Sequence, residues 1–320
     1  MMLLAGLMGM ALVGATVFLG FDGSEEDEDV FGAVVPPGDP DVGVILSGDS
    51  DDEAISGTDS ADQINGYAGA DTIDGGDGDD ELHGWEGDDL VSGGRGADTV
   101  HGETGDDALR GDAGDDSLFG HSDSDTLSGG EGTDTVYGGA GDDLLWGDEG
   151  DDALHGGLDN DTLIGGLGLD TLFGGWGDDL LDGREPSAAE QDYLNGGGGD
   201  DEVVAGGLDV VTSGTGADTI FIGDWIAEDE EAQITDFNVL EDRLIIVFDD
   251  ALAGDDDPEI RLLTDALDPT VTHVQMNGEL IAAVTSDMEI MLSDLSIMAE
   301  SDAALLFGGL WASPAEAGVV

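Results

Sequence analysis

The sequence contains no cysteine and very few basic residues. Only 5 of its 320 residues are Lys or Arg, against 77 Asp or Glu, and the formal net charge is −72. Without cysteine, no disulfide can stabilise the fold. Without basic groups, the chain cannot displace the counterions of a nucleic acid, so nucleic acid is excluded as a partner. At this charge density, self-repulsion opposes a compact state unless cations are bound.

Three classes of protein have so acidic a composition: a disordered solvating tail, a halophilic protein with an acidic surface, and a polyvalent cation-binding protein. Acidic charge alone is most typical of disorder. The 56 glycines and the 39% of hydrophobic residues do not match a simple acidic tail. A fold without disulfides needs another source of stability, and bound metal is the obvious candidate.

A nine-residue period runs through the middle of the chain. Sixteen large aliphatic residues follow one another at this spacing, from Leu46 to Leu181. A glycine stands two positions after each of them. From Asp62 to Asp179, an aspartate stands seven positions after the aliphatic residue, fourteen times in succession. The aliphatic, glycine and aspartate positions thus form three columns with the same nine-residue spacing, and columns of this length predict a repeat solenoid.

The repeat unit reads G-G-x-G-x-D-x-U-x, where U is a large aliphatic residue, and residues 75–82 and 138–145 are clear copies. This pattern resembles the RTX, or haemolysin-type, calcium-binding nonapeptide repeat. The resemblance covers roughly residues 46–222. It implies a parallel β-roll in which each ion lies between two turns on the same side, bound by the aspartates of both turns and by glycine carbonyls.

Elementary geometry leads to a similar structure. Nine residues suit one turn and one short strand, and we expect the x-U-x triplet to be the strand, with U pointing inward. The glycines permit the positive φ angles of a tight turn. Two repeats then make one circuit, and residues 18 apart stack at about 4.8 Å. Roughly nine layers would enclose a core too thin to offset the chain entropy alone.

The turns must therefore supply stability through metal. Carboxylates and carbonyls are the oxygen ligands that Ca²⁺ prefers, whereas five scattered histidines and no cysteine argue against zinc. The fourteen successive aspartates form twelve same-side pairs, so we expect about a dozen Ca²⁺ ions. The predicted metal ligands are Asp62, Asp71, Asp80, Asp89, Asp98, Asp107, Asp116, Asp125, Asp134, Asp143, Asp152, Asp161, Asp170, Asp179, Asp192, Asp201 and Asp218.

One face of the predicted roll carries a ladder of rings. The position after U faces solvent, and in alternate repeats it holds an aromatic or imidazole side chain. Three interpretations remain open: cross-strand stacking that stabilises the sheet, docking of an N- or C-terminal segment, and a platform for a carbohydrate or another ligand. The ladder residues are His83, His101, Phe119, Tyr137, His155 and Phe173.

We expect an all-β fold, a parallel β-roll (RTX β-solenoid) with a C-terminal β-rich capping region and an N-terminal apolar helix. Residues 1–21 carry no charge and are long enough to span a bilayer. They lack a basic n-region and an A-x-A site, so a membrane anchor, an atypical signal segment and a buried apolar segment all remain open. The chain is therefore predicted to have five parts. The apolar segment at 1–21 is followed by an acidic Pro/Gly linker at 22–45 and by the roll at 46–222, which has an insertion at 184–191. The cap at 223–300 and a candidate type I secretion signal at 301–320 complete the chain.

The cap region shows ordinary β patterning. Strands are predicted at 233–237, 242–247, 271–276 and 279–284, and Asn277-Gly278 between the last two predicts a hairpin turn. We expect His273 to be an exposed strand residue. At the end of the chain, Glu316 before terminal hydrophobic residues resembles the signal of type I secretion substrates.

No catalytic motif is evident. The chain contains no H-E-x-x-H motif, and Gly120 to Ser124 only partly matches a nucleophile elbow and lies in register as a turn. We therefore expect a non-enzymatic, secreted or surface-anchored protein that binds calcium, exported with the help of type I secretion machinery. The alternative is a secreted enzyme or toxin-like protein whose activity lies in the face of the roll or in the C-terminal region.

Overall fold

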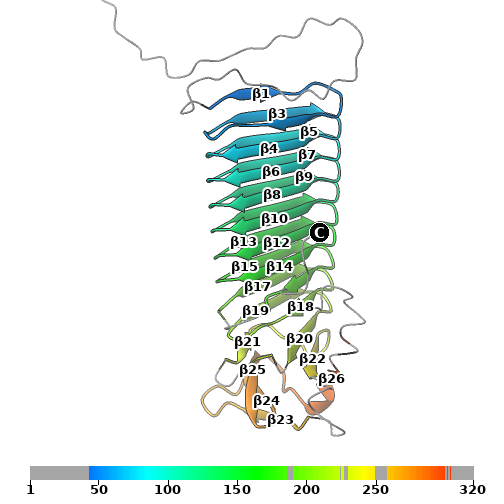
Figure 1. Ribbon diagram of the computed structural model, residues 1–320. Coiled ribbons are helices and arrows are strands. Elements are labelled where there is room, and N and C mark those ends of the chain that lie inside the picture. The colour runs from blue at the N-terminus through cyan, green and yellow to red at the C-terminus, as the bar shows by residue number, and fades with distance from the viewer. Residues whose placement is uncertain are drawn as a thin grey trace, which may run out of the picture.

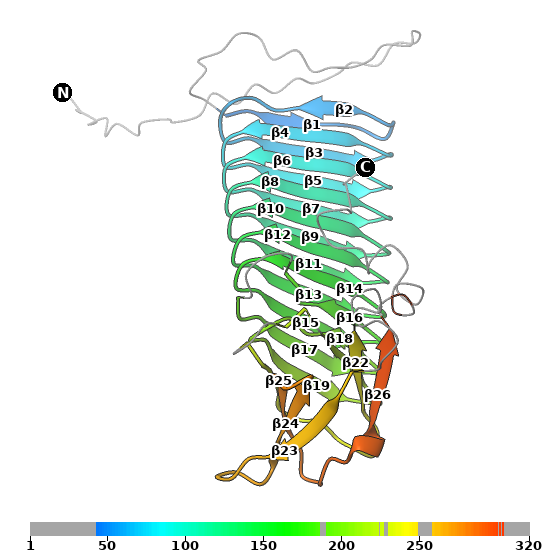
Figure 2. The ribbon, with the colours of Figure 1, turned by 60° about the horizontal axis from the view of Figure 1, so that its bottom comes forward.

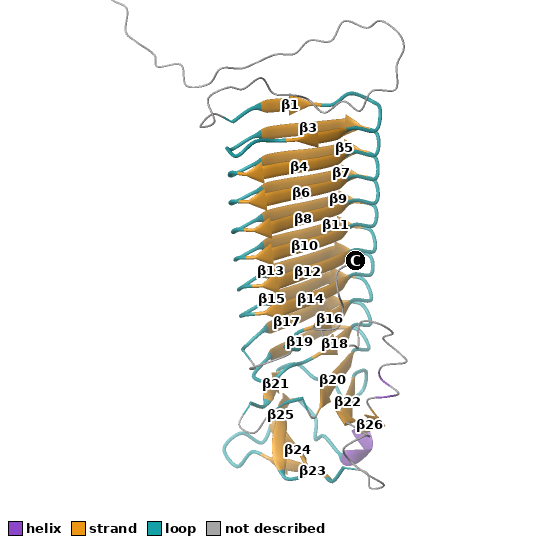
Figure 3. Cartoon of the chain, viewed as in Figure 1, coloured by secondary structure: helices purple, strands orange, loops and turns teal. Residues whose placement is uncertain are grey.

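The computed structural model describes residues 43–185, 190–223, 225–226, 230–248, 258–299, 301 and 303. The chain winds into a solenoid of two long facing sheets (Figure 1), and each circuit adds one strand to each sheet. The turns stack in rows along the edges of the sheets (Figure 3). The predicted all-β parallel β-roll is confirmed.

The two sheets contain 14 and 12 strands. The first sheet consists, in spatial order, of β1 (Ile45–Ser47), β3 (Gln63–Ala68), β5 (Glu81–Glu86), β7 (Thr99–Thr104), β9 (Ser117–Ser122), β11 (Thr135–Ala140), β13 (Ala153–Leu158), β15 (Thr171–Trp176), β17 (Tyr193–Gly198), β19 (Val210–Thr215), β21 (Ala232–Ile234), β25 (Glu279–Thr285), β24 (Val271–Met276) and β23 (Ile260–Thr264). The second consists of β2 (Ala54–Ser56), β4 (Thr72–Asp77), β6 (Leu90–Arg95), β8 (Ala108–Ala113), β10 (Thr126–Glu131), β12 (Leu144–Glu149), β14 (Thr162–Leu167), β16 (Leu180–Asp182), β18 (Glu202–Val204), β20 (Thr219–Gly223), β22 (Arg243–Phe248) and β26 (Leu295–Ala299). A short 3-10 helix, η1 (Leu292–Asp294), precedes β26.

The strand register follows the nine-residue period. Leu127 of β10 pairs with Leu145 of β12, an offset of 18 residues. Across the insertion at 184–191 the offset grows to 22, because Leu172 pairs with Leu194. In the next layer it falls to 17, because Leu194 pairs with Val211. The predicted insertion and a single-residue deletion in the next layer therefore change the spacing along the chain but leave the strand pairing intact.

The aliphatic column forms the core. Its members from Ile64 to Leu181 are at most 1% exposed. The strands are longer than the predicted triplet: most have six residues, and the glycine two positions after U also faces inward. A side chain at this glycine would strike the buried aspartate of the following turn. The glycine column therefore lies within the strand and leaves room for the aspartate.

The C-terminal strands extend both sheets. β22 and β26 continue the second sheet in parallel, while β21 and β25 continue the first (Figure 2). The predicted hairpin is confirmed, because β24 and β25 are antiparallel and join through Asn277 and Gly278 with φ angles of 54° and 100°. These strands cover the aliphatic core at the end of the roll.

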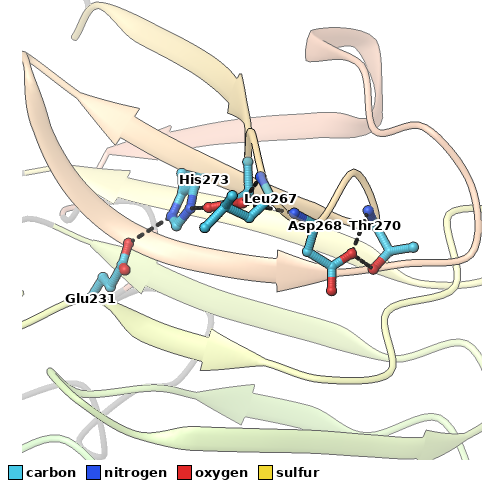
Figure 4. Close-up of polar contacts among 6 residues, drawn as sticks. Glu231, Leu267, Asp268, Thr270 and His273 are labelled. Atoms are coloured by element: carbon cyan, nitrogen blue, oxygen red, sulfur yellow. Dashed lines mark hydrogen bonds and ion pairs between the residues drawn. The ribbon is translucent and has the colours of Figure 1, made fainter.

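His273 is not the exposed residue predicted from the sequence. Its ring is about one-fifth exposed and lies between two carboxylates, with Nδ1 3.1 Å from Glu231 Oε2 and Nε2 3.4 Å from Asp265 Oδ2 (Figure 4). The backbone amides of Leu267 and Asp268 donate to the other oxygen of Asp265. The loop after β23 therefore folds back onto this ring, which alternation along the strand could not predict.

Several expectations concern residues outside the described part. These residues are the apolar segment at 1–21, nearly all of the linker at 22–45 and most of the C-terminal stretch at 301–320. Among the residues that the structure describes, no helix is long and apolar enough to cross a membrane.

Candidate metal-binding turns

The seventeen predicted aspartates line the turns of the roll and are all buried. Each is at most 3% exposed. Burial of an ionised carboxylate without a partner is costly, so the turns must provide compensating contacts. The positions follow from the repeat, because each aspartate stands two residues before a buried aliphatic side chain.

One oxygen of each aspartate is bound by the backbone. The amide of Asp107 donates to Oδ1 of Asp125 at 2.8 Å, and the amide of Asp125 donates to Oδ1 of Asp143 at 2.8 Å. The same bond recurs along both edges and continues across the insertion, where Asp170 donates to Asp192. These bonds place the backbone of each aspartate beside the carboxylate two turns later.

The other oxygen has no hydrogen-bond partner. For sixteen of the seventeen aspartates, Oδ2 is buried and unpaired; in Asp62 it accepts from the amide of Thr58. Native proteins rarely leave a buried polar atom unpaired, and a missing ion is one explanation. Sixteen equivalent orphaned oxygens in one column fit a cation-binding role for these residues.

Backbone carbonyls face the same space. A Cβ built on Gly138 would clash with Oδ2 of Asp143 and would lie 2.8 Å from the carbonyl oxygen of Gly156. Gly156 stands in the same relation to Asp161 and Gly174, with the carbonyl 2.6 Å away. The glycine column thus leaves a small cradle lined by a carboxylate and a carbonyl oxygen. Such all-oxygen sites suit a hard cation such as Ca²⁺.

Burial also raises the pKa values of sixteen of these carboxyl groups. The pKa is about 7 for Asp107, about 8 for Asp125 and Asp152, and about 9 for Asp192. Desolvation is the largest cause, and neighbouring carboxylates add to it. Asp125, Asp152 and Asp192 therefore favour the protonated form at neutral pH when no metal is bound, and a cation would compete with those protons.

Two further buried aspartates accept backbone hydrogen bonds in the same way but were not predicted from the sequence. Asp209 is fully buried, and its carboxylate accepts from the amides of Asp192 and Gly206. Asp242 accepts from the amide of Asp218 at 3.3 Å and extends the row into the cap. Both stand two residues before an inward aliphatic residue. An aspartate two residues before an inward aliphatic residue is therefore a signal that could have identified Asp209 and Asp242, although the nine-residue period is interrupted there.

The ladder on the first sheet is a continuous stack of rings. Successive centroids from His83 to His155 lie 4.5 to 5.2 Å apart with interplanar angles of at most 10°. Phe173 ends the stack in an edge-on contact, at 62° to His155. This geometry is that of cross-strand stacking. The docking and ligand interpretations remain predictions, since the terminal segments lie outside the described residues.

Comparison with known proteins agrees with this architecture. No curated protein matches the chain. A family model described as the RTX calcium-binding nonapeptide repeat matches residues 47–82, 56–91, 66–100, 92–127, 101–136, 128–163, 155–185 and 189–220. These stretches cover more than half of the chain and coincide with the stacked turns. The chain therefore belongs to the family of proteins with RTX calcium-binding nonapeptide repeats.

Proposed function

We propose that the protein is a non-enzymatic, extracellular or cell-surface calcium-binding protein whose roll folds on Ca²⁺ after export. The observation that carries the proposal is the column of sixteen buried Oδ2 atoms without a partner. In an apo roll these oxygens are left unsatisfied in a chain of net charge −72. Bound Ca²⁺ supplies the missing partners and reduces the repulsion.

The seventeen predicted aspartates are the proposed ligands, together with Asp209 and glycine carbonyls. Each ion would lie between turns two apart, so neighbouring sites share an aspartate and fill cooperatively. About a dozen ions is the expected number. Sites of the extracellular class bind Ca²⁺ with dissociation constants on the order of 10⁻⁴ to 10⁻³ M. The roll would therefore stay expanded in the cytosol and form outside the cell.

The proposed organisation follows from this coupling. The segment at 1–21 would anchor the protein or direct its export, the linker at 22–45 would connect it to the roll at 46–222, and the cap at 223–300 would close the roll. The stretch at 301–320 would present the signal to type I secretion machinery. The apolar run at the start and the acidic residue before terminal hydrophobic residues support these roles. The absence of a catalytic motif in the sequence supports a structural or binding role.

The test is far-UV circular dichroism of the purified chain during a calcium titration, followed by addition of chelator. We expect a cooperative gain of β signal with Ca²⁺ and its loss with chelator, together with compaction in small-angle scattering. A β signal that is complete without Ca²⁺ and ignores chelator would rule out calcium-coupled folding. A screen for hydrolase and membrane-lysis activity tests the non-enzymatic role, and turnover abolished by one substitution would contradict it.

A further inference from the structure

Three of the five histidines, dispersed in the sequence, meet on the first sheet. His83, His101 and His121 lie on β5, β7 and β9, which are neighbouring strands. Glu103, also on β7, lies among them. We call this group the histidine site; it consists of His83, His101, Glu103 and His121. Its residues lie on the strand face, whereas the calcium aspartates lie in the turns.

Ligand atoms of His83, His101 and Glu103 converge, and His121 adjoins this group through His101. Nδ1 of His101 lies 2.9 Å from Nε2 of His121, and Nδ1 of His83 lies 3.7 Å from Oε1 of Glu103. One such atom from each of His83, His101 and Glu103 lies within 4.8 Å of the others. Ligands of a tetrahedral Zn²⁺ ion are about 3.3 Å apart, as follows from bond lengths of about 2.0 to 2.1 Å. Metal binding would therefore require the stacked rings to rotate until these atoms reach that separation.

The site also contains an unsatisfied atom. Nδ1 of His83 is buried and makes no hydrogen bond. Stacking explains the parallel rings of the ladder, but it leaves this nitrogen without a partner.

Two residues of the histidine site have a left-handed backbone. Glu103 and His121 have φ angles of 84° and 80°, in the left-handed region that non-glycine residues rarely occupy. The next layers of the same column carry glycine, beginning with Gly139 and Gly157. Tyr67 and Trp85, in the preceding layers of the column, have the same conformation, so it is a property of this column of the roll. Two residues of the histidine site therefore stand where the repeat favours glycine.

We propose that the histidine site binds one divalent transition-metal ion of the zinc class on the face of the roll. Imidazole nitrogens suit Zn²⁺, whereas Ca²⁺ prefers oxygen, so the two metals would separate by ligand type between the strand face and the turns. This revises the expectation that scattered histidines argue against zinc, because an 18-residue circuit brings distant residues together.

The test is a calorimetric titration of the full chain with ZnCl₂ in excess Ca²⁺, which occupies the turn carboxylates. We expect about one Zn²⁺ per chain. His121→Gly removes a ligand while restoring the residue that the column favours, so it should keep the calcium-dependent β signal and weaken Zn²⁺ binding at least about tenfold. His155→Gln is the matched control, since His155 belongs to the same stack but lies two layers beyond His121, and it should bind as the parent does.

A second variant and a spectroscopic measurement complete the test. His101→Gln should also weaken binding, and Co²⁺ at the site should give the visible absorption bands of a low-coordinate ion with nitrogen ligands. The proposal is overturned if the parent chain binds no Zn²⁺ in excess Ca²⁺, or if His121→Gly and His101→Gln both bind it as tightly as His155→Gln does.

Discussion

The backbone amide of Asp125 donates a 2.8 Å hydrogen bond to Oδ1 of Asp143, 18 residues later on the same edge of the roll. The second oxygen of Asp143, Oδ2, is buried without a partner beside the carbonyl of Gly156. One carboxylate thus has two separable roles. Its Oδ1 fixes the spacing of two turns, and its Oδ2 is available to a cation.

Substitution Asp143→Asn separates these roles. The amide side chain keeps an oxygen that can accept from Asp125 but loses the negative charge. We expect the roll still to form at high Ca²⁺, with a higher midpoint in the calcium titration. The number of bound ions should fall by about one or two, because each aspartate serves two same-side sites. Circular dichroism and equilibrium dialysis measure the two quantities.

Asp74→Asn is the control for loss of charge alone. Asp74 lies on β4 with an exposed side chain, away from the turns. It should leave the ion count unchanged and shift the midpoint only slightly. An equal loss of ions in both variants would mean that overall charge, rather than the buried oxygen, determines calcium binding.

Substitution Gly138→Ala tests the cradle itself. The added methyl group would occupy the space between Oδ2 of Asp143 and the carbonyl of Gly156. We expect loss of the local ion and a destabilisation of about 1 to 3 kcal/mol, as for overpacking of a dense interior. Chemical denaturation in saturating Ca²⁺ measures it. Thr126→Ala, at an exposed strand position, should cost much less, and equal costs would contradict the cradle.

We expect low pH to replace calcium in part as a source of stability for the roll. The pKa values of about 7 for Asp107 and about 8 for Asp125 lie above the unfolded value of about 3.9. A raised pKa in the folded state means that the folded state holds protons more tightly than the unfolded state does. Protonation of these carboxyl groups therefore stabilises the metal-free roll at low pH, and this stabilisation is lost as pH rises through about 7 to 8. Metal-free protein should therefore show more β signal at about pH 5 than at about pH 8.

In the presence of Ca²⁺, lowering the pH should oppose folding of the roll instead of favouring it. Protons and Ca²⁺ compete for the same oxygens, so the calcium midpoint should rise as pH falls. Circular dichroism at a series of pH values, with and without Ca²⁺, measures both trends. A metal-free β signal that weakens on acidification would contradict the assigned burial of these carboxyl groups.

The sequence predicted most of the roll because its information is periodic. The aliphatic and aspartate columns determine which residues face inward and which residues stack, and the register of Leu127 on Leu145 follows directly. The length of the strands did not follow, because glycine was interpreted as a turn residue. Its small size matters instead within the strand, where it leaves room for the aspartate of the next turn.

What the sequence did not predict depends on contacts across layers. Asp209 fell outside the column because one residue is deleted before it, although it occupies the same place in the turn. His121 was not in the predicted ladder because it stands two positions beyond Phe119, and its approach to His101 depends on the left-handed backbone at that position. The position of His273 depends on a loop that no period describes.

His273 provides a test of the cap. Burial by itself would lower its pKa, but the hydrogen bonds to Glu231 and Asp265 outweigh burial and raise it. A histidine with a raised folded pKa stabilises the fold below its unfolded pKa of about 6.5, and this contribution is lost as pH rises through the folded pKa. His273→Gln should therefore speed hydrogen exchange in β24 and β25 at about pH 6 and have little effect at about pH 9.

The matched comparison is His155→Gln, which removes an imidazole from the ladder rather than from the cap. Burial lowers the pKa of His155, so its charged form does not stabilise the fold, and exchange in β24 should not respond to the substitution at either pH. The calcium midpoint reports on the turns and should stay close to that of the parent in His273→Gln. If His273→Gln has the same effect at both pH values, the ring acts through packing rather than through its charge, and the paired carboxylates do not hold the loop by charge.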